Sequence, residues 1–405
     1  MNVPVSRDLL IINTAAFLRS FSFGLTGVVL GIYLFRVGLS SFNIGMVIGA
    51  GLVGSAAATV GVTTQADRLG RRRTLAVLSL LNATGAMALA LTPALPTLML
   101  MAFVGMLNGT GTDRSASFAL EQAIIPGLVP DTLRTWSLSW YNVVLDAAGS
   151  FGALAAALPL LLQRWLTVPL LTSYRSVFVG CAVLSLVTAV LYPFASDAVE
   201  VSKPATAPSP HHISPATRKV VAKLAGLFSL DAFGGGFLTD ALVAYWFFRR
   251  FGIAEESLGI LFFAVHLLNA ASHLGAAWLA RRIGLVNTMV FTHLPSSVFL
   301  IAAAFAPSVK LAVLLFLCRE ALVEMDVPTR QSYVAAVVLP NERTFASGIT
   351  NLARNVFWAV GSAVAGFLMQ IVALSAPLAI GGGAKIGYDL LLYRAFRSLK
   401  PPEER

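Results

Sequence analysis

The sequence is poor in charged residues and in cysteine, and both shortages exclude classes of protein. Of its 405 residues only 12% are charged, whereas 57% are apolar. A typical soluble domain has about 25% charged residues, so a soluble chain of this length would lack the charge to cover its surface. The two cysteines, Cys181 and Cys318, both lie in apolar runs, which excludes a disulfide framework and a Cys-x-x-Cys metal motif. We therefore expect a membrane protein with lipid against most of its surface.

Sequence motifs of common enzymes and of ATP-driven pumps are also lacking. The chain contains no G-x-x-x-x-G-K-[ST], G-x-S-x-G or H-E-x-x-H motif, so we expect neither an enzyme nor a cofactor. The formal net charge of +10 would indicate a nucleic-acid partner in a soluble protein. In a membrane protein it is better explained by basic loops beside anionic lipid, and no nucleic-acid partner is expected.

Long apolar runs, in contrast, are abundant. A helix needs about 20 mainly apolar residues to cross the hydrocarbon core, and polar or Pro/Gly breaks divide the chain into twelve such runs. The predicted spans are residues 8–35, 42–66, 73–93, 96–126, 135–162, 174–195, 219–249, 256–281, 286–305, 309–338, 344–373 and 377–396. With the N-terminus in the cytoplasm, 17 Lys and Arg residues fall on inner segments and 6 on outer ones. This bias predicts a multi-pass protein of the cytoplasmic (inner) membrane with both termini cytoplasmic.

The chain is predicted to consist of two related halves. Residues 196–217 are polar and rich in proline, which is typical of a linker. The Arg-Leu-Gly of residues 68–70 recurs as the Arg-Ile-Gly of residues 282–284, an offset of 214. Parallel duplication of this kind is the design of one large transporter class. The predicted organisation is an N-terminal six-helix bundle at 1–195, a cytoplasmic linker at 196–217 and a C-terminal six-helix bundle at 218–405.

The connection after the second span carries a motif with a known likeness. Residues 67–73 read D-R-L-G-R-R-R, which resembles the signature loop G-x-x-x-D-R-x-G-R-R of the major facilitator superfamily. Thr63 stands where that motif begins with glycine, and Arg281 stands at the acidic position of the second-half copy. The resemblance implies an all-α membrane protein with twelve transmembrane helices in two pseudo-symmetric six-helix bundles. It also implies a secondary active transporter that works by alternating access, here expected as a monomer with no subfamily assigned.

The signature loop is expected to act as a conformational latch. Its glycine permits a tight turn, its acid can face a helix N-terminus, and its arginines can reach acidic residues of other helices. The predicted latch residues are Asp67, Arg68, Gly70, Arg71 and Glu121, with Glu121 as the partner of Arg68 or Arg71. Arg72 and Arg73 are expected only to add positive charge on the inner face.

Ionisable side chains within the spans are costly, and each is a functional hypothesis by default. They gather on the first, fourth, fifth, seventh and tenth spans. The candidate residues of a substrate or coupling cavity are Arg19, Asp113, Arg114, Asn142, Asp146, Asp231, Arg319, Glu320, Glu324, Asn351 and Arg354. The alternative for each charged residue is an ion pair that only holds helices together.

Local patterns in the seventh span give one of these residues a more specific role. By the repeat offset, Arg19 corresponds to a position two residues from Asp231. The resemblance implies that the first helices of the two halves face each other across the pathway, so either an Arg19–Asp231 pair or an anion site at Arg19 is expected. Three consecutive glycines, 234–236, weaken the same span. They predict either a bend that exposes backbone carbonyls or close helix packing.

The tenth span holds two further pairs. Glu320 and Glu324 lie one turn apart, and their mutual repulsion in a medium of low dielectric favours proton uptake by one of them. The alternative is neutralisation by a nearby arginine, Arg319 or Arg354. Asp326 and Arg330 are expected to form a structural salt bridge, beside a kink at Pro328.

Three transport functions fit these residues. The first is proton-coupled efflux of a small organic molecule, with that solute, protons and the lipid bilayer as partners. The second is an organic-anion carrier that uses Arg19, Arg114 and Arg319. The third is a divalent-metal exporter that uses Asp231 and His266.

Overall fold

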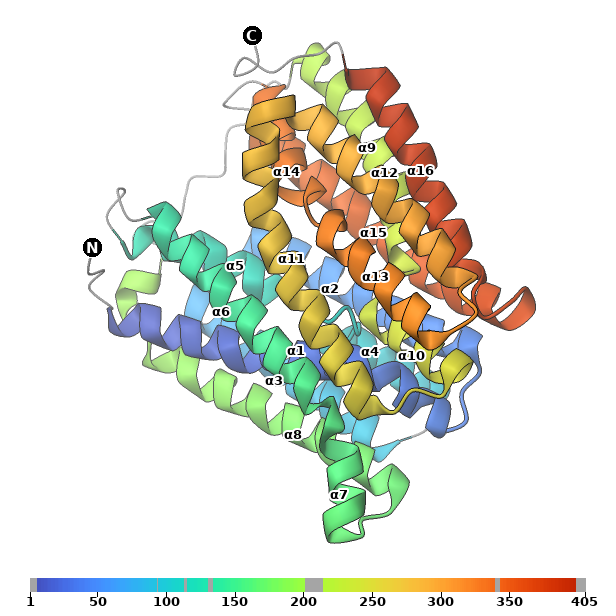
Figure 1. Ribbon diagram of the computed structural model, residues 1–405. Coiled ribbons are helices and arrows are strands. Elements are labelled where there is room, and N and C mark those ends of the chain that lie inside the picture. The colour runs from blue at the N-terminus through green and yellow to red at the C-terminus, as the bar shows by residue number, and fades with distance from the viewer. Residues whose placement is uncertain are drawn as a thin grey trace. The chain divides into compact units, whose positions relative to one another are not determined.

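The computed structural model describes residues 6–92, 94–112, 115–129, 134–200, 214–338 and 343–397, and every regular element in these ranges is a helix (Figure 1). The α-helices are α1 Arg7–Arg36, α2 Ser41–Leu69, α3 Arg71–Leu91, α4 Leu95–Gly105, α5 Ala116–Ile124, α6 Arg134–Leu154, α7 Leu158–Leu166, α8 Leu170–Leu191, α9 Pro215–Gly236, α10 Asp240–Phe251, α11 Glu255–Ile283, α12 Leu285–Ala304, α13 Val309–Val323, α14 Asp326–Ala336, α15 Arg343–Ile371 and α16 Ala376–Phe396. Within the described ranges, nine helical segments are long and apolar enough to cross a membrane. The prediction of an all-helical membrane protein is confirmed.

Twelve predicted spans become sixteen helices because four of the spans are interrupted. The break in the fourth span was not predicted. There α4 ends at Gly105, and Met106 takes a left-handed conformation with φ 57°. The following Asn-Gly-Thr-Gly run is a turn-forming sequence, and the Oδ1 of Asn108 accepts a hydrogen bond from the backbone N–H of Thr110 at 3.1 Å. This local bond gives the backbone an alternative to the helix.

The breaks in the seventh and tenth spans follow from glycine and proline. Helix α9 ends at Gly236, at the end of the three glycines. A Cβ atom on Gly236 would lie 2.2 Å from the backbone oxygen of Trp358, so this glycine also permits close packing of α9 on α15. In the tenth span, α13 ends at Val323 and α14 begins at Asp326. The break falls one turn before Pro328, because proline has no N–H to donate to the carbonyl four residues earlier.

The described residues fall into two compact units. Unit 1 is Met1–Ser209 with Thr239–Phe248 and Gly252–Phe263, and unit 2 is Pro210–Leu238 with Arg249–Phe251 and Ala264–Arg405. In unit 1, α1 packs on α6 and α3 on α8. In unit 2, α9 packs on α15 and α12 on α16 (Figure 1). These are corresponding pairs under the sequence repeat, so the repeat in the sequence is matched by a repeated packing.

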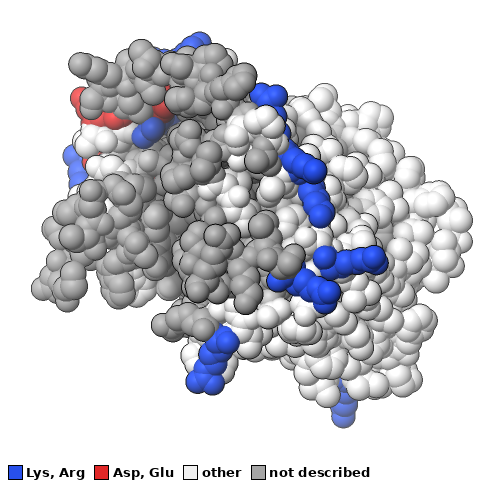
Figure 2. Space-filling model, turned by 90° about the horizontal axis from the view of Figure 1, so that it is seen from above, with Lys and Arg blue, Asp and Glu red and all other residues white. Residues whose placement is uncertain are grey.

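Side chains of α8 show how the fold suits lipid. Val183, Leu186 and Val190 are 50%, 44% and 61% exposed, whereas the polar Ser185 and Thr188 on the same helix are buried. This is the reverse of a soluble amphipathic helix. Figure 2 shows one face of the molecule, on which most of the described surface is uncharged.

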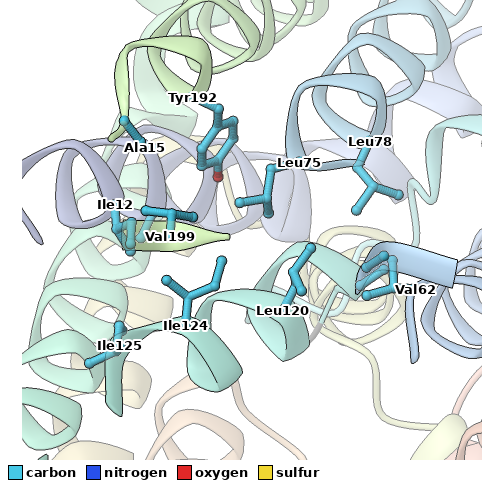
Figure 3. Packing of buried hydrophobic residues seen from close by; sticks show 14 of the residues in the cluster. Ile12, Ala15, Val62, Leu75, Leu78, Leu120, Ile124, Ile125, Tyr192 and Val199 are labelled. Atoms are coloured by element: carbon cyan, nitrogen blue, oxygen red, sulfur yellow. The ribbon is translucent and has the colours of Figure 1, made fainter. Parts of the chain in front are cut away.

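An apolar cluster in unit 1 surrounds the first polar site described below. It joins α1, α3 and α5 to the segment after α8 (Figure 3). Its labelled members are Ile12, Ala15, Val62, Leu75, Leu78, Leu120, Ile124, Ile125, Tyr192 and Val199. Tyr192 contributes its ring to this cluster, and its hydroxyl makes hydrogen bonds in the polar site.

Two glycines of α2 differ sharply in their surroundings and give a matched test of helix packing. A Cβ atom on Gly54 would lie 1.9 Å from the backbone oxygen of Phe103 in α4, whereas one on Gly61 would meet nothing within 4 Å. We expect Gly54→Ala to destabilise the protein by about 1–3 kcal/mol through overpacking. Gly61→Ala should be neutral or stabilise by up to about 1 kcal/mol, because alanine is the better helix former. Thermal unfolding in detergent compares the two, and equal melting temperatures would contradict the observed helix approach.

Candidate functional site

A buried ion pair in unit 1 joins α1 to α5. The guanidinium of Arg19 donates to both carboxylate oxygens of Glu121, from Nη1 to Oε1 at 3.2 Å and from Nη2 to Oε2 at 2.6 Å. Tyr192 accepts from Arg19 at 2.7 Å and donates to Oε1 at 2.6 Å, and Tyr141 donates to Oε2 at 2.5 Å. Glu121 is completely buried. Four side chains from α1, α5, α6 and the end of α8 thus form one fully connected polar network.

This network corrects two predicted pairings. Glu121 pairs with Arg19 rather than with Arg68 or Arg71, and the Nε of Arg71 bonds to Asp67 one turn away in sequence, at 2.8 Å. Asp231 pairs with basic residues of its own unit, so the expected Arg19–Asp231 pair is also wrong. The physical reason is that α1 packs on the other helices of its own bundle, where a buried cation and a buried anion satisfy each other at short range.

A small polar pocket in unit 1 lies beside this network. Its lining comes from α1, α3, α8 and both sides of the break between α4 and α5. The lining residues are Arg19, Phe23, Leu78, Ser79, Asn82, Met106, Ser115, Ser117, Ser185 and Thr188. The amide of Asn82 donates to the carbonyl of Gly105 at 2.9 Å, so it satisfies backbone that the helix break leaves open.

A larger group of charges is buried in unit 2 around Asp231 of α9. The Nζ of Lys385 donates to Oδ1 of Asp231 at 2.8 Å. Arg330 and Arg354 place guanidinium nitrogens 3.6 and 3.8 Å from Oδ2, and the Nε2 of His293 lies 3.7 Å from Oδ1. Asp231 is only 4% exposed. One carboxylate therefore has four basic side chains around it, contributed by α12, α14, α15 and α16.

Two further carboxylates complete this group. Asp389 accepts from the Nδ1 of His293, at 3.0 and 3.1 Å to its two oxygens. Asp326 accepts from Arg330 at 2.5 Å, which confirms the predicted salt bridge one turn apart on α14. We call the whole set the Asp231 cluster; its members are Asp231, His293, Asp326, Arg330, Arg354, Lys385 and Asp389. Its three carboxylates balance its two guanidiniums and one ammonium when His293 is neutral.

The two units repeat one ion pair with the charges reversed. Beyond the signature loop the repeat continues at an offset of 209 residues, as Gln122 and Gln331 show, so Glu121 corresponds to Arg330. Arg19 lies in the span that corresponds to the one holding Asp231. Each unit thus links its first span to its fourth through opposite charges. The cation is on the first span in unit 1 (Arg19), but on the fourth span in unit 2 (Arg330).

The remaining candidates of the tenth span bear on the choice between proton coupling and neutralisation by a nearby arginine. Arg319 pairs with the adjacent Glu320, which favours neutralisation over proton coupling at Glu320. Glu324 lies half-buried at the break between α13 and α14.

Other predicted cavity residues are less enclosed. Asn142 and Asn351 occupy matched positions in the two halves and both are exposed, while Asp146 is half-buried. Asp113 and Arg114 lie outside the described residues. Among the described residues no group of three or more His, Cys, Asp or Glu side chains could hold a metal ion, so the metal-exporter alternative finds no site in this part of the chain.

Sequence reasoning missed three members of the Asp231 cluster as site residues. Lys385 and Asp389 lie one turn apart on α16, within the predicted twelfth span. His293 is the one ionisable residue of α12. A usable signal was present, because an acid and a base at i, i+4 within a span are expected to face protein rather than lipid.

The signature loop is held by a contact that sequence did not predict. Gly70 has φ 92°, a conformation that favours glycine, and joins α2 to α3. The carboxylate of Glu200 accepts from the backbone N–H groups of Arg71 and Arg72 at 2.6 and 3.2 Å, at the start of α3. The side chain of Arg72 bonds to Glu200 and to Asp197. Arg72 therefore fixes the segment after α8, beyond adding positive charge.

This contact predicts a pH-dependent anchoring of the segment 195–200. Partial burial raises the pKa of Glu200, but hydrogen bonds from Arg71 and Arg72 outweigh it and hold the pKa below its ordinary value. The stabilisation is therefore present above about pH 4.3, the value for an unfolded glutamate, and is lost only as pH falls through the lower folded value. We expect Glu200→Gln to raise the rate of protease cleavage in 195–200 at neutral pH by up to about fivefold.

Asp197→Asn is the matched control for this experiment. Asp197 also contacts Arg72, but its side chain is 93% exposed, and an exposed pair contributes little. A cleavage rate for Glu200→Gln no higher than that for Asp197→Asn would contradict the anchoring role of Glu200.

Comparison with known proteins agrees with this architecture. The family model described as the Major Facilitator Superfamily matches residues 12–319. An uncharacterized membrane protein of Saccharomyces cerevisiae is 25% identical over 96% of this chain and 93% of its own length.

Solved structures share the fold at low identity. The nucleoside transporter NupG is 15% identical with a TM-score of 0.73, covering 97% of this chain and 100% of its own. The xylose transporter XylE from E. coli, in a partially occluded inward-open conformation, is 14% identical with a TM-score of 0.71, covering 96% and 98%. A bacterial homolog of the human lysosomal transporter Spinster is 15% identical with a TM-score of 0.73, covering 96% and 94%. The chain belongs to the major facilitator superfamily and is a multi-pass membrane transporter rather than an enzyme.

Proposed function

We propose that this protein is a proton-coupled exporter of a small organic solute. It acts as a monomer in the cytoplasmic membrane with both termini cytoplasmic, as the distribution of basic residues predicts. The observation that carries the proposal is Asp231, a buried carboxylate on a spanning helix with four basic side chains within 4 Å. Such a group is costly in a membrane interior, and proton coupling gives it a use.

The surroundings of Asp231 support coupling in two ways. Its partners come from four other helices, so a proton gained or lost by any of them alters contacts throughout unit 2. In addition, α9 ends at Gly236, about one and a half turns beyond Asp231. Interrupted helices in transporters expose backbone groups that bind solutes and ions. The carboxylate that organises these charges and a solute site at the helix break would lie on the same helix.

The organic-anion alternative has less support from the described residues. A human organic anion transporter, MFSD10, shares the fold with 18% identity and a TM-score of 0.61, covering 96% of this chain and 100% of its own. In this chain, however, Arg19 and Arg319 are paired with the carboxylates of Glu121 and Glu320. A free anion would have to compete with those carboxylates.

Transport by the purified protein in liposomes tests the proposal. The probes are radiolabelled uridine, D-xylose and p-aminohippurate, one from each solute class named for the structural relatives. An exporter that exchanges solute for protons accumulates its solute in vesicles with an acidic interior, and we expect at least about tenfold less accumulation after nigericin collapses the gradient. Accumulation only in vesicles with an alkaline interior would indicate symport, and accumulation that is indifferent to nigericin would overturn proton coupling.

A further inference from the structure

The side chains of Asp389, His293, Lys385 and Asp231 form an unbroken line of contacts through unit 2. Asp389 bonds to the Nδ1 of His293, the Nε2 of His293 lies 3.3 Å from the Nζ of Lys385, and Lys385 donates to Asp231 at 2.8 Å. We propose that His293 takes up and releases the transported proton at its Nε2 atom, held between Asp389 and the Lys385–Asp231 pair. This inference deepens the proposed function and rests on it.

The geometry assigns different tasks to the two ring nitrogens. Nδ1 faces both oxygens of Asp389, at 3.0 and 3.1 Å, so it carries a hydrogen whether the ring is neutral or charged. Nε2 faces Lys385, an ammonium group that only donates. In the neutral ring, the lone pair of Nε2 therefore accepts from Lys385. Nε2 is the atom that remains to bind a proton.

Protonation of Nε2 rearranges the neighbouring side chains. The arriving proton leaves its donor and binds Nε2, and no other covalent bond forms or breaks. An N–H at Nε2 repels the ammonium of Lys385, which keeps its three hydrogens. The same N–H attracts Oδ1 of Asp231, now 3.7 Å away. His293 thus replaces Lys385 as a donor to Asp231, and the Asp231 cluster changes from balanced to a net charge of +1. This shift connects a proton on α12 to the position of α16 against α9.

The other charged groups around the ring leave His293 as the group best placed to change charge. From α14, Arg330 and Asp326 pair with each other at 2.5 Å, and from α15, Arg354 lies 3.8 Å from Asp231. Histidine has an unperturbed pKa between pH 5 and 8, unlike any other side chain in the cluster.

A buried hydroxyl beside the ring offers an independent observation. Tyr388 is completely buried, and its ring stands perpendicular to that of His293 with centroids 6.0 Å apart. Its hydroxyl has no hydrogen-bond partner within the described part of the chain. A buried unsatisfied hydroxyl is unfavourable. The hydroxyl of Tyr388 can donate to a water molecule, or to a carboxylate that has lost its hydrogen bond from Lys385.

Nuclear magnetic resonance of histidine nitrogens tests the inference without requiring a known solute. The full-length protein is labelled with ¹⁵N-histidine in detergent, and His293 is assigned by the loss of its signals in His293→Gln. If that variant does not fold, substitution of the other four histidines assigns His293 by elimination. We expect Nδ1 to be protonated throughout, and Nε2 to change from acceptor to protonated between about pH 8.5 and about pH 5. A Nε2 signal that stays constant over this range overturns the proposal.

The same resonance measurement is made on a test variant, Asp389→Asn, and on a control variant, His266→Gln. The amide of Asp389→Asn lacks the charge that favours an imidazolium, so the change at Nε2 should move to lower pH. His266 lies on α11 and serves as the matched control, since His266→Gln should leave the His293 transition in place. Failure of this inference is distinct from failure of the proposed function. Proton-coupled transport with an invariant His293 signal rejects only the relay, whereas a titrating His293 without coupled transport rejects only the function.

Discussion

Replacing Glu121 with alanine is expected to destabilise the protein by about 3–5 kcal/mol, because it leaves the buried guanidinium of Arg19 without its counter-charge. Glu121 also accepts from the hydroxyls of Tyr141 and Tyr192, and both buried donors lose a partner. The loss is measured as a lower melting temperature and a smaller folded fraction in detergent. Among the described residues, this is the substitution in unit 1 for which we expect the largest effect.

Two control variants separate the charge from the packing. The double variant Arg19→Met, Glu121→Met removes both charges at similar volume and should recover most of the lost stability. Asp67→Asn removes the acid of a pair whose carboxylate is 45% exposed, and should cost less than about 1 kcal/mol. A double variant as unstable as Glu121→Ala would show that packing, rather than an uncompensated charge, accounts for the loss.

Asp231→Asn is expected to abolish proton-driven accumulation of solute, with a reduction of about 100-fold or more. A change of this size corresponds to about 2.7 kcal/mol of lost coupling. The reason is that the amide cannot hold the charge that orders the four basic side chains around it. The measurement is accumulation in liposomes with an acidic interior, together with solute exchange at equal pH, which requires no proton movement.

Glu324→Gln is the matched control for Asp231. It also neutralises a carboxylate in a spanning segment, at the break between α13 and α14. Glu324 influences the charge of Arg330, one of the cations around Asp231, whereas Asp231 has four basic side chains within 4 Å. We expect Glu324→Gln to retain most of its proton-driven accumulation. The opposite result, loss in Glu324→Gln and retention in Asp231→Asn, would return proton coupling to the acids of the tenth span that the sequence favoured.

Local relationships were predictable from the sequence, whereas long-range pairings were not. The Asp326–Arg330 bridge follows from a spacing of four residues on one helix. The Arg19–Glu121 pair joins residues 102 apart in the chain. For Arg19, the sequence repeat pointed to the wrong helix, because corresponding positions in two halves have no need to touch. Pairing within a bundle depends on helix packing, which a single sequence does not specify.

The fold itself was predictable because lipid imposes a simple rule. Spanning segments must be apolar and helical, so hydropathy located most of the predicted spans, and a helix lies in each of them. The breaks required turn chemistry in addition. The three glycines before Phe237 and the proline at 328 signalled two of them, and the Asn-Gly-Thr-Gly run after Leu107 signalled a third that hydropathy alone concealed.

His293, Lys385 and Asp389 show the limit of reading each span separately. His293 is the one ionisable residue of α12, and Lys385 and Asp389 lie among mainly apolar residues on α16. Their significance appears only when α9, α12 and α16 are packed together. The same is true of Tyr141 and Tyr192, whose aromatic rings suit a membrane protein anywhere, but whose hydroxyls complete the site of Glu121.

Movement of protons driven by a solute gradient is a direct measure of proton coupling, because coupling between two transported species must be reciprocal. Liposomes containing the protein and the pH-sensitive dye pyranine are given a gradient of whichever of uridine, D-xylose and p-aminohippurate the protein transports, with no initial pH difference. We expect solute entering the vesicles to drive protons out, so that the interior becomes alkaline in the wild type and remains unchanged in Asp231→Asn. Solute entry in the wild type without any change in internal pH would show that this protein does not exchange solute for protons.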